Sequence, residues 1–484
     1  MRPKLEVLER ELIDRILAEA FQLIEKPGVR VAPYVTELLD SAGVRVQDGV
    51  AHIPEKVARK ALESVPREFF LHNRAGTPAV HYGGDDVQFD PGSSCLNILD
   101  AETQQPRPAQ SSDLVRMVQV TEMLPQYAAQ STAMVCNDVP AEMGDWYRLL
   151  LVLWHSQKPV VTGAFSGPTL QIMLELLAID SGGRESLRKK PRAVFDVCPS
   201  PPLNWSEFAS ENIVELARAG VPAEIVSMPL SGATAPVTLV GSVVQHAAEC
   251  ISGIVLHQLA CPGAPIVWGA APAIFDMRTG KTPMGAIETV MLDMACAQVG
   301  KFIGVPTHGY LVAGDGKLID AQTEMESGIS AVLGALAGIN MISGAGMLDF
   351  LACHSIEKLV IDAEAIASAQ RLLQGIGART ETLATSMFAQ TGLTGDFLKL
   401  KDTRALFRSE QHFPSEVIDR GREGVAPDVV KRARERVERL VAAYQQPDID
   451  AGTLERMRAL AQHHASAAGL RELPGLTAHE LALR

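Results

Sequence analysis

The sequence predicts an α/β fold built on a (β/α)8 TIM-type barrel, with helical and hairpin additions before the barrel and a helical extension after it. Between about residues 113 and 365, short apolar runs alternate with amphipathic helical stretches. Most runs start roughly 30 to 40 residues apart, the length of one strand–helix unit. Continuous apolar runs are typical of parallel strands covered on both faces. Eight such units over roughly 250 residues suit a closed barrel better than an open sheet.

Eight runs are the predicted strands. They are Ala129–Val135, Pro159–Gly163, Ala193–Cys198, Glu224–Met228, Pro265–Gly269, Pro306–Val312, Asn340–Ser343 and Lys358–Ile361. Each run is followed by polar or small residues and then by a helical pattern. The order therefore predicts alternating strands and helices around one parallel sheet.

We divide the chain into residues 1–112 as an N-terminal helical and hairpin region, 113–370 as the catalytic barrel, and 371–484 as a C-terminal helical extension. Apolar residues at helical spacing predict helices within 4–72, and a turn cluster at His81–Asp86 predicts a hairpin within 72–100. Pro427 suits the first turn of a helix that runs to Tyr444. The extension leads us to expect a homo-oligomer.

Composition excludes several classes of protein. The chain has 484 residues with 47% hydrophobic and 21% charged residues, which excludes a disordered chain. A net charge of -13 makes nucleic acid an unfavourable partner. The seven cysteines show no CxxC pair and indicate reduced thiols. No targeting segment and no stretch as long as a membrane span is evident, so we expect a cytoplasmic protein.

Candidate site residues follow the predicted strands, because a parallel barrel carries its chemistry at the carboxyl ends of the strands. The segments are Ser231–Thr234, Trp268 with Asp276, Thr307–Tyr310 with Gly314–Lys317, and Ser343–Gly346 with His354. Each also has a structural explanation: a turn with a helix cap, a core tryptophan, or a buried histidine. The residues alone leave both explanations open.

Three familiar motifs are absent. Gly314-Asp315-Gly316-Lys317 lacks the spacing and the Ser/Thr of a phosphate-binding loop. No HxH, HExxH or CxxC supports a zinc site at His308, Cys353 and His354, and we predict no metal. No GxSxG supports a serine nucleophile.

Taken in order, several segments resemble the trimethylamine methyltransferase superfamily. They are Ser231–Pro236, Gln245 through Cys261–Ile266, Asp276–Gly280 with Gly285 and Glu288, Asp315–Lys317 with Asp320–Gln322 and Glu326, Leu336–Asn340, Ile356–Glu364 and Ile418–Arg420. The resemblance spans most of the chain, and its specificity lies in the ordered succession.

The resemblance implies a barrel whose mouth presents a methylamine to a separate corrinoid protein, so that the corrinoid (cobalamin) cofactor belongs to the partner. Trimethylamine-specific members carry pyrrolysine in a loop that we align with Gly314–Lys317. This chain has only standard residues there. A quaternary ammonium needs no acid to release a neutral tertiary amine, so the departure points to the branch that uses quaternary amines such as betaines.

On that resemblance, Trp268 and Tyr310 would face the ammonium, and Asp315 or Glu326 would offset its charge. His354 would donate to the betaine carboxylate, with His308 as the second candidate. Ser231 and Thr234 would line the floor of the site, and Gly232, Gly314 and Gly316 would lie against the cofactor.

Three alternatives stay open. The chain could use another methyl donor or acceptor. It could be a metal-dependent barrel lyase or hydrolase, which bound metal or inhibition by a chelator would reveal. It could also be an osmolyte-binding module, which would bind betaine without methylating a corrinoid.

Overall fold

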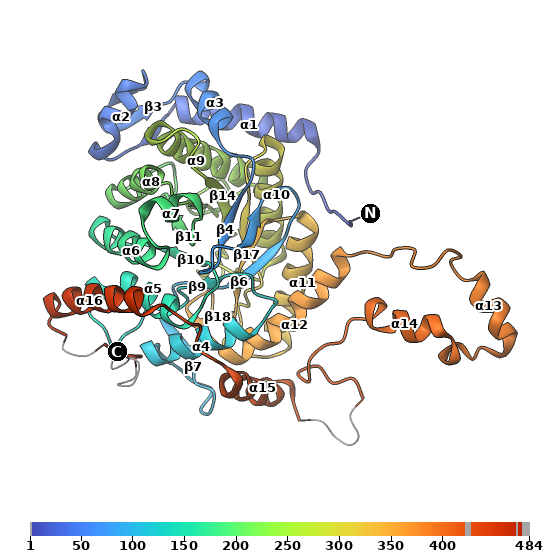
Figure 1. The fold of residues 1–484 in the computed structure, drawn as a ribbon. Helices are drawn as coiled ribbons and strands as arrows, with labels where there is room; N and C mark the ends of the chain where they lie inside the picture. The colour runs from blue at the N-terminus through green and yellow to red at the C-terminus, as the bar shows by residue number, and fades with distance from the viewer. Residues whose placement is uncertain (1, 422–426, 471–472, 477–484) are drawn as a thin grey trace.

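The computed structural model describes residues 2–421, 427–470 and 473–476 of the chain. Parallel strands lie at its centre and helices surround them (Figure 1). Five strands form one sheet in the order β14-β12-β11-β10-β9, and three form a second in the order β16-β17-β6. The strands are β6 (Gln88–Pro91), β9 (Gln130–Ser131), β10 (Val160–Gly163), β11 (Ala193–Val197), β12 (Ala223–Ser227), β14 (Ile266–Ala270), β16 (His308–Tyr310) and β17 (Met341–Ala345). The α/β class is therefore confirmed.

The two sheets meet at both ends. On one side, Trp268 of β14 forms a parallel bridge with Thr307, the residue before β16. On the other side, the Ala128 N–H, two residues before β9, donates to the Phe89 carbonyl of β6 over 2.9 Å. Every pairing within the two sheets is parallel.

The helices of this central part follow the strands in chain order. They are α4 (Ser111–Met123), α5 (Gly144–His155), α6 (Gly167–Asp180), α7 (Arg184–Lys189), α8 (Glu207–Ala219), α9 (Leu239–Ala260), α10 (Ile287–Ile303), α11 (Ala321–Ala337) and α12 (Ile356–Leu373). Side chains define where several of them begin: Ser166 caps α6, Asp320 caps α11 and Ser355 caps α12. Left-handed glycines end α8, α10 and α11.

Seven of the eight predicted strands coincide with strands of the two sheets, and the eighth is wrong. Lys358–Ile361 lies within α12, where the apolar side chains of Leu359, Val360 and Ala363 are buried. The position beside β17 is taken by β6. A short apolar run does not distinguish a buried helix from a strand, and that ambiguity caused the error.

The hairpin lies earlier than predicted. It pairs β4 (Phe69–His72) with β5 (Pro78–Tyr82), so the turn cluster His81–Asp86 follows the hairpin and leads into β6. Leu71, Val80 and Tyr82 of the hairpin pack in one cluster with apolar side chains from both sheets, namely Ala129, Val161, Val194, Val267 and Met341. The five side chains from the sheets all lie near the amino-terminal ends of their strands. The hairpin therefore closes the amino-terminal end of the space between the sheets.

The N-terminal region adds helices α1 (Arg10–Glu25), α2 (Thr36–Ser41) and α3 (Glu55–Ser64), the 3-10 turn η1 (Pro33–Val35), and an antiparallel sheet of β1 (Val29–Arg30), β3 (Val50–His52) and β2 (Arg45–Gln47). Smaller strands lie at the carboxyl-terminal end of the two central sheets. They are β7 (Asn97–Leu99), β8 (Pro106–Pro108), β13 (Leu230–Ser231), β15 (Ala273–Ile274), β18 (Met347–Leu348) and β19 (Cys353–His354), with η2 (Ala141–Met143) between β9 and α5.

The C-terminal region is helical, as predicted. Its helices are α13 (Thr385–Thr391), α14 (Lys401–Glu410), α15 (Val429–Ala443) and α16 (Ala451–Ala467), with the 3-10 turns η3 (Gly392–Thr394) and η4 (Phe397–Lys399). Helix α15 packs on α4 and α12, whereas α13 and α14 extend away from the rest of the molecule (Figure 1).

Helix α9 corrects one expectation. Its 22 residues have a mean hydropathy of 1.5, long and apolar enough to cross a membrane by length and composition. However, 83% of that apolar window is buried inside the structure, where α9 packs on α1, α3 and α8. All seven cysteines are free, which agrees with the prediction of reduced thiols.

Candidate functional site

A band of polar side chains lines the space between the two sheets, just beyond the apolar cluster. The Ser343 hydroxyl donates to Asp90 Oδ1 over 2.6 Å, and His308 Nε2 lies 2.9 Å from the Ser343 hydroxyl. His308 Nδ1 lies 3.1 Å from Glu224 Oε1. Asp196, next to Glu224 in the paired strands β11 and β12, completes the band. Five strands thus supply one polar group each, and we call these five residues the acidic band.

Two carboxyl groups of the band, Asp196 and Glu224, lie opposite each other in neighbouring strands. Each disfavours the ionised form of the other, because two like charges this close in a buried place repel. Desolvation raises the pKa of Asp196 to about 7. Desolvation, with the charge of Asp196 second, raises the pKa of Glu224 well above its usual value. The hydroxyl of Tyr82 donates to the Oε2 atom of Glu224 over 3.3 Å.

His308 is neutral. Burial lowers the pKa of its imidazole to about 3, and no part of this effect comes from a neighbouring charge. Its contact with Glu224 is thus a contact between two uncharged groups, not an ion pair. The ring orients Ser343 through its Nε2 atom, whereas its Nδ1 atom only lies near Glu224.

No basic side chain in the described part of the chain offsets the acidic band. The charges that act on Asp90 and Asp196 include no Lys or Arg of the described chain. Asp90 Oδ2 and Asp196 Oδ1 are buried oxygen atoms without a hydrogen-bond partner. Part of Asp196 and of Cys198, two residues later on the same side of the strand, remains accessible. Buried carboxyl groups without a counter-charge are costly, so the band is suited to a cationic ligand that enters beside β11.

Tyr310 lies next to the band. Its ring centroid is 6.4 Å from that of His308, and its hydroxyl accepts the Ser93 N–H over 2.8 Å. Burial raises the pKa of the phenol, which stays protonated at neutral pH. The structure thus brings together the predicted site residues His308 and Tyr310.

The prediction for Trp268 is wrong. Its indole points to the outer face of β14, where Nε1 donates to the Cys296 carbonyl of α10 over 2.9 Å and the ring meets His246 of α9. The side chain is fully buried there. It cannot face a ligand between the sheets.

Asp315 and Glu326 lie together but are occupied by backbone groups. Asp315 accepts the N–H groups of Met284 and Gly285 at 2.7 and 2.9 Å, and Glu326 accepts the Asp315 N–H at 2.8 Å. Desolvation raises the pKa of Asp315 to about 6 against these hydrogen bonds. The pair braces the loops after β15 and β16.

The remaining predicted residues hold their own loops. Ser231 donates to the carbonyls of Pro236 and Val237, and Thr234 accepts the Leu230 N–H. Gly232 has a left-handed backbone with φ of 91°. Gly314 and Gly316 both lie against Thr323 of α11, with no room for a Cβ atom. These contacts give each of the five residues a structural role within its loop.

His354 lies in the small sheet β18-β19-β7-β8. It does not take part in the hydrogen bonds that link His308, Ser343 and Asp90. Its ring packs on Gly346, and burial, followed by the charge of Lys358, lowers its pKa to about 3. Neither ring nitrogen has a side-chain hydrogen-bond partner. His354 is thus a neutral, buried imidazole with spare hydrogen-bonding capacity.

Strained backbone marks the carboxyl-terminal end of the sheets. Val312, two residues after β16, has φ of 65°, an outlier for a β-branched residue. Asp349, Phe350 and Leu351 are left-handed in succession, with φ of 48°, 55° and 70°. The Asp349 N–H donates to the Gly316 carbonyl, which ties this turn to the loop after β16. Such strain gathers at functional sites.

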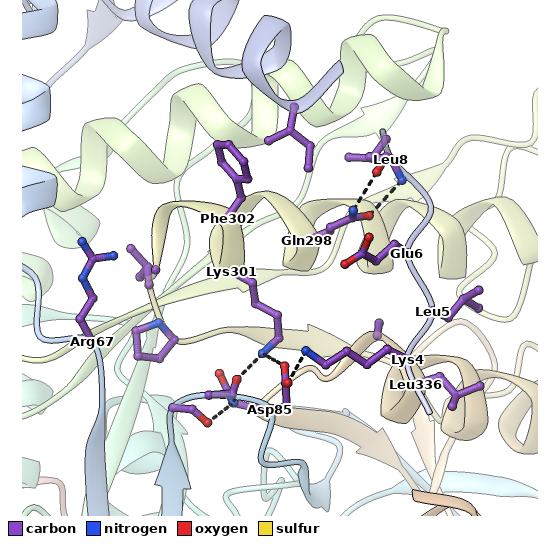
Figure 2. Close-up of a pocket in the computed structure, with 18 of the residues that line it drawn as sticks. Lys4, Leu5, Glu6, Leu8, Arg67, Asp85, Gln298, Lys301, Phe302 and Leu336 are labelled. Carbon is purple, nitrogen blue, oxygen red and sulfur yellow. Dashed lines mark hydrogen bonds and ion pairs between the residues drawn. The ribbon is translucent and has the colours of Figure 1, made fainter. Parts of the chain in front are cut away.

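A pocket of about 570 Å³ lies at the opposite end of the sheets (Figure 2). The N-terminal segment crosses it, held by Gln298, whose side chain accepts the N–H groups of Val7 and Leu8 at 2.9 Å. Asp85 pairs there with Lys4 and Lys301. Pro306 and Asn340, which precede β16 and β17, line it. Because the apolar cluster separates this end from the acidic band, we do not assign it to the same site.

The band was missed from the sequence, although a signal existed. Asp196 and Glu224 are acidic residues within or at the edge of apolar strand runs, and a charge in a strand covered on both faces needs a reason. Within the described residues, no group of three or more His, Cys, Asp or Glu side chains is arranged to hold a metal ion.

Comparisons with known proteins agree with this architecture. The profile of a family described as trimethylamine methyltransferase matches residues 1–468. The chain is 31% identical to the trimethylamine methyltransferase MttB2 of Methanosarcina mazei over 456 residues, 91% of each protein. It is 26% identical to the glycine betaine methyltransferase of Desulfitobacterium hafniense over 456 residues, 93% of this chain and 95% of the relative. The crystal structure of the monomethylamine methyltransferase MtmB of Methanosarcina barkeri has a similar fold, with a TM-score of 0.54 at 13% identity over 90% of this chain and 89% of that chain.

Proposed function

The chain belongs to the trimethylamine methyltransferase family, and we propose that it transfers a methyl group from a quaternary amine of the betaine type to the Co(I) atom of a corrinoid protein. The corrinoid is a substrate carried by a partner, and the chain itself binds and orients the amine. Since all seven cysteines are free, we place this reaction in the cytoplasm.

The observation that carries the proposal is the acidic band without a counter-charge. A permanent cation between Asp90 and Asp196 would favour their ionised forms and offset the cost of burying them. The same contact would hold the ammonium in one position for attack on its methyl carbon. The accessible edge of Asp196 provides the side from which the ligand reaches the band.

A quaternary amine fits the chemistry of these residues. When the methyl carbon–nitrogen bond breaks, both bonding electrons go to nitrogen, and a neutral tertiary amine leaves without needing a proton. Because no proton is transferred in this step, neither His308 nor Glu224 has to act as an acid or a base. The low pKa of His308 and the raised pKa of Glu224 are compatible with such a reaction. The standard residues at Gly314–Lys317 favour a donor of this kind over trimethylamine.

A betaine also needs a partner for its carboxylate. We propose His354 for this role, because its ring nitrogens lack side-chain partners and a neutral imidazole can donate one N–H. Tyr310 is the proposed wall of the ammonium site, since its ring neighbours His308.

We also propose that the two parallel sheets act as one closed (β/α)8 barrel. Two contacts support closure: the bridge between Trp268 and Thr307, and the hydrogen bond from Ala128 to Phe89. A closed wall would leave the carboxyl-terminal end as the entrance, where active sites of such barrels lie.

The corrinoid protein would dock at that entrance. Large apolar side chains in the segments that follow β6, β10, β12, β14 and β16 are exposed there: Leu96, Phe165, Met228, Val237, Met277 and Leu318. Apolar side chains gathered around an entrance are typical of a protein contact surface.

The test is anaerobic incubation of the protein with Co(I) cobalamin, or with a cognate corrinoid protein, and a panel of quaternary and tertiary amines. Conversion of the Co(I) spectrum to methyl-Co(III) with one betaine is the expected result, and His354→Ala should raise the betaine concentration needed for half-maximal rate. Conversion with tertiary amines alone, or with no amine even when the corrinoid protein is supplied, would overturn the proposal. Inhibition by a chelator would favour the metal-dependent alternative.

A further inference from the structure

Residues 375–413 form an arm that leaves the body after α12 and returns beside it (Figure 1). The arm carries α13 and α14. Its root is held on α12, where Arg371 donates to the Glu410 carbonyl over 2.9 Å. Just beyond the arm, the Ser415 N–H donates to the Glu364 carboxylate at 3.2 and 3.3 Å. Both contacts hold the root, and the rest of the arm points away from its own body.

The arm exposes apolar side chains along its whole length. Leu393 is 101% exposed, Ile376 99%, and Leu383 and Leu398 81% each. Phe388 meets Phe397, and Phe407 meets Phe413, in edge-to-face pairs, but Phe388, Phe407 and Phe413 remain exposed. Single exposed apolar residues are ordinary, whereas a segment with so many and no core beneath them needs a partner surface.

The body of the same chain carries an apolar surface that no other described part of the chain covers. Ile287 and Met291 lie one turn apart on α10, and Met325 and Ile329 lie one turn apart on the neighbouring helix α11. All four side chains are between 41% and 58% exposed. We call this strip the α10–α11 face. Its two methionines can adapt to a partner of irregular shape.

We propose that the arm of one copy of this chain lies on the α10–α11 face of a second copy, and that the exchange is reciprocal. Each chain then donates one apolar segment and receives another, which closes a two-fold dimer without leaving either surface exposed. Within the described part of one chain, the arm and the α10–α11 face do not contact each other, so each is available to a second copy.

Charge favours the same pairing. The arm presents Lys401, Arg404 and Arg408 along one side of α14, all exposed. The α10–α11 face begins beside the exposed acids Glu288 and Asp320, with Lys317 as the opposing charge nearby. In a chain of net charge -13, a basic helix is better placed against a second copy than in isolation.

Light scattering after size exclusion, across micromolar concentrations and without substrate, tests the proposal. The wild-type chain should have the mass of a dimer or a multiple of it. The double variant Leu393→Asp/Leu398→Asp, on the arm, and the double variant Met325→Asp/Ile329→Asp, on the face, should each weaken self-association at least tenfold. Phe208→Asp, which changes an exposed apolar residue on α8, is the matched control and should keep the wild-type mass.

Circular dichroism and thermal melting ensure that each variant is folded. If both double variants keep the wild-type mass, or if the wild type is a monomer, the proposal is wrong. Mass gained only on addition of a corrinoid protein would assign the surface to that partner and would equally overturn it.

A cross-link identifies the two surfaces directly. Leu398→Cys chains with one tag, mixed with Met325→Cys chains carrying another tag, should form a cross-linked pair that contains both tags. Each single variant, tested by itself, shows any cross-link that forms through the native cysteines. Failure to form the mixed pair, or a cross-link within one chain that carries both substitutions, would contradict an exchanged arm. Because no substrate is involved, this outcome is independent of the proposed reaction.

Discussion

The acidic band and the arm are incomplete in opposite ways. The band buries Asp90 and Glu224, and part of Asp196, with no Lys or Arg of the described residues to offset them, and the arm exposes leucines and phenylalanines without a core. Buried charge and exposed apolar surface are both unfavourable in isolation. What each region lacks indicates its partner: a small cation for the band and a protein surface for the arm. The comparison teaches that an unsatisfied region can reveal the chemistry of its partner.

Removing the charge of the band should have the largest effect. In Asp196→Asn the carboxylate that offsets the ammonium is gone, and we expect kcat/KM for the betaine to fall by about 100-fold, the scale typical of a lost electrostatic contact in an active site. Glu381→Gln, on the arm, is the control and should retain full activity. Steady-state methylation of Co(I) cobalamin measures both. Equal activity of Asp196→Asn and wild type would show that the band does not bind the substrate.

Crowding the ring of His354 should have the next largest effect. A Cβ atom on Gly346 would lie 2.5 Å from His354 Nε2, and the glycine has φ of 85°. We expect Gly346→Ala to lower the free energy of unfolding by about 2 to 3 kcal/mol. Gly182→Ala, where φ is 79° and nothing lies within 4 Å, isolates the backbone cost and should lose only about 1 kcal/mol. Urea denaturation at one protein concentration compares them, and equal losses would show that the ring can move aside.

The pH dependence of betaine binding sharpens the role of the band. Burial raises the pKa of Asp196 to about 7, and a bound cation would favour the ionised form. Binding should therefore release a proton, so that affinity rises as pH increases toward 7 and levels off above it. We expect about a tenfold gain between one unit below and one unit above that pKa. Titration calorimetry at several pH values measures it, and Asp196→Asn should flatten the curve. An affinity that falls with rising pH would contradict the assignment.

The same shift affects stability with a defined sign. A carboxyl group whose pKa is raised in the folded state binds its proton more tightly there than in the unfolded chain. For Asp196 this contribution is present at low pH and is lost as pH rises from the unfolded value near 4 to about 7. A bound cation should reduce that loss.

Trp268→Phe should have the smallest effect. The substitution removes the hydrogen bond from Nε1 to the Cys296 carbonyl and costs about 1 kcal/mol of stability, while KM for the betaine stays unchanged. Thermal or urea unfolding and steady-state kinetics provide the two readouts. A raised KM would return Trp268 to the substrate site.

The comparison also shows where sequence-based prediction failed. Seven strand positions followed from apolar runs, but those runs carried no alternation that could say which side chains face inward. Trp268 and Glu224 lie in neighbouring strands of this kind, and only the structure shows that the first faces α10 and the second faces the band. Asp90 was outside the predicted barrel, because β6 is short and follows a turn.

The α/β class, the family, the places of most strands and the helices of the described C-terminal residues could be predicted from the sequence, because periodicity and ordered motifs are local or linear properties. Which polar groups meet could be seen only in the folded chain. Residues 90, 196, 224, 308 and 343 converge because parallel strands that are distant in the sequence lie side by side, with Asp196 directly opposite Glu224 and with Ser343 hydrogen-bonded to Asp90 and His308. Exposure of the arm was likewise decided in three dimensions, because a leucine in the core and one awaiting a partner look the same in the sequence.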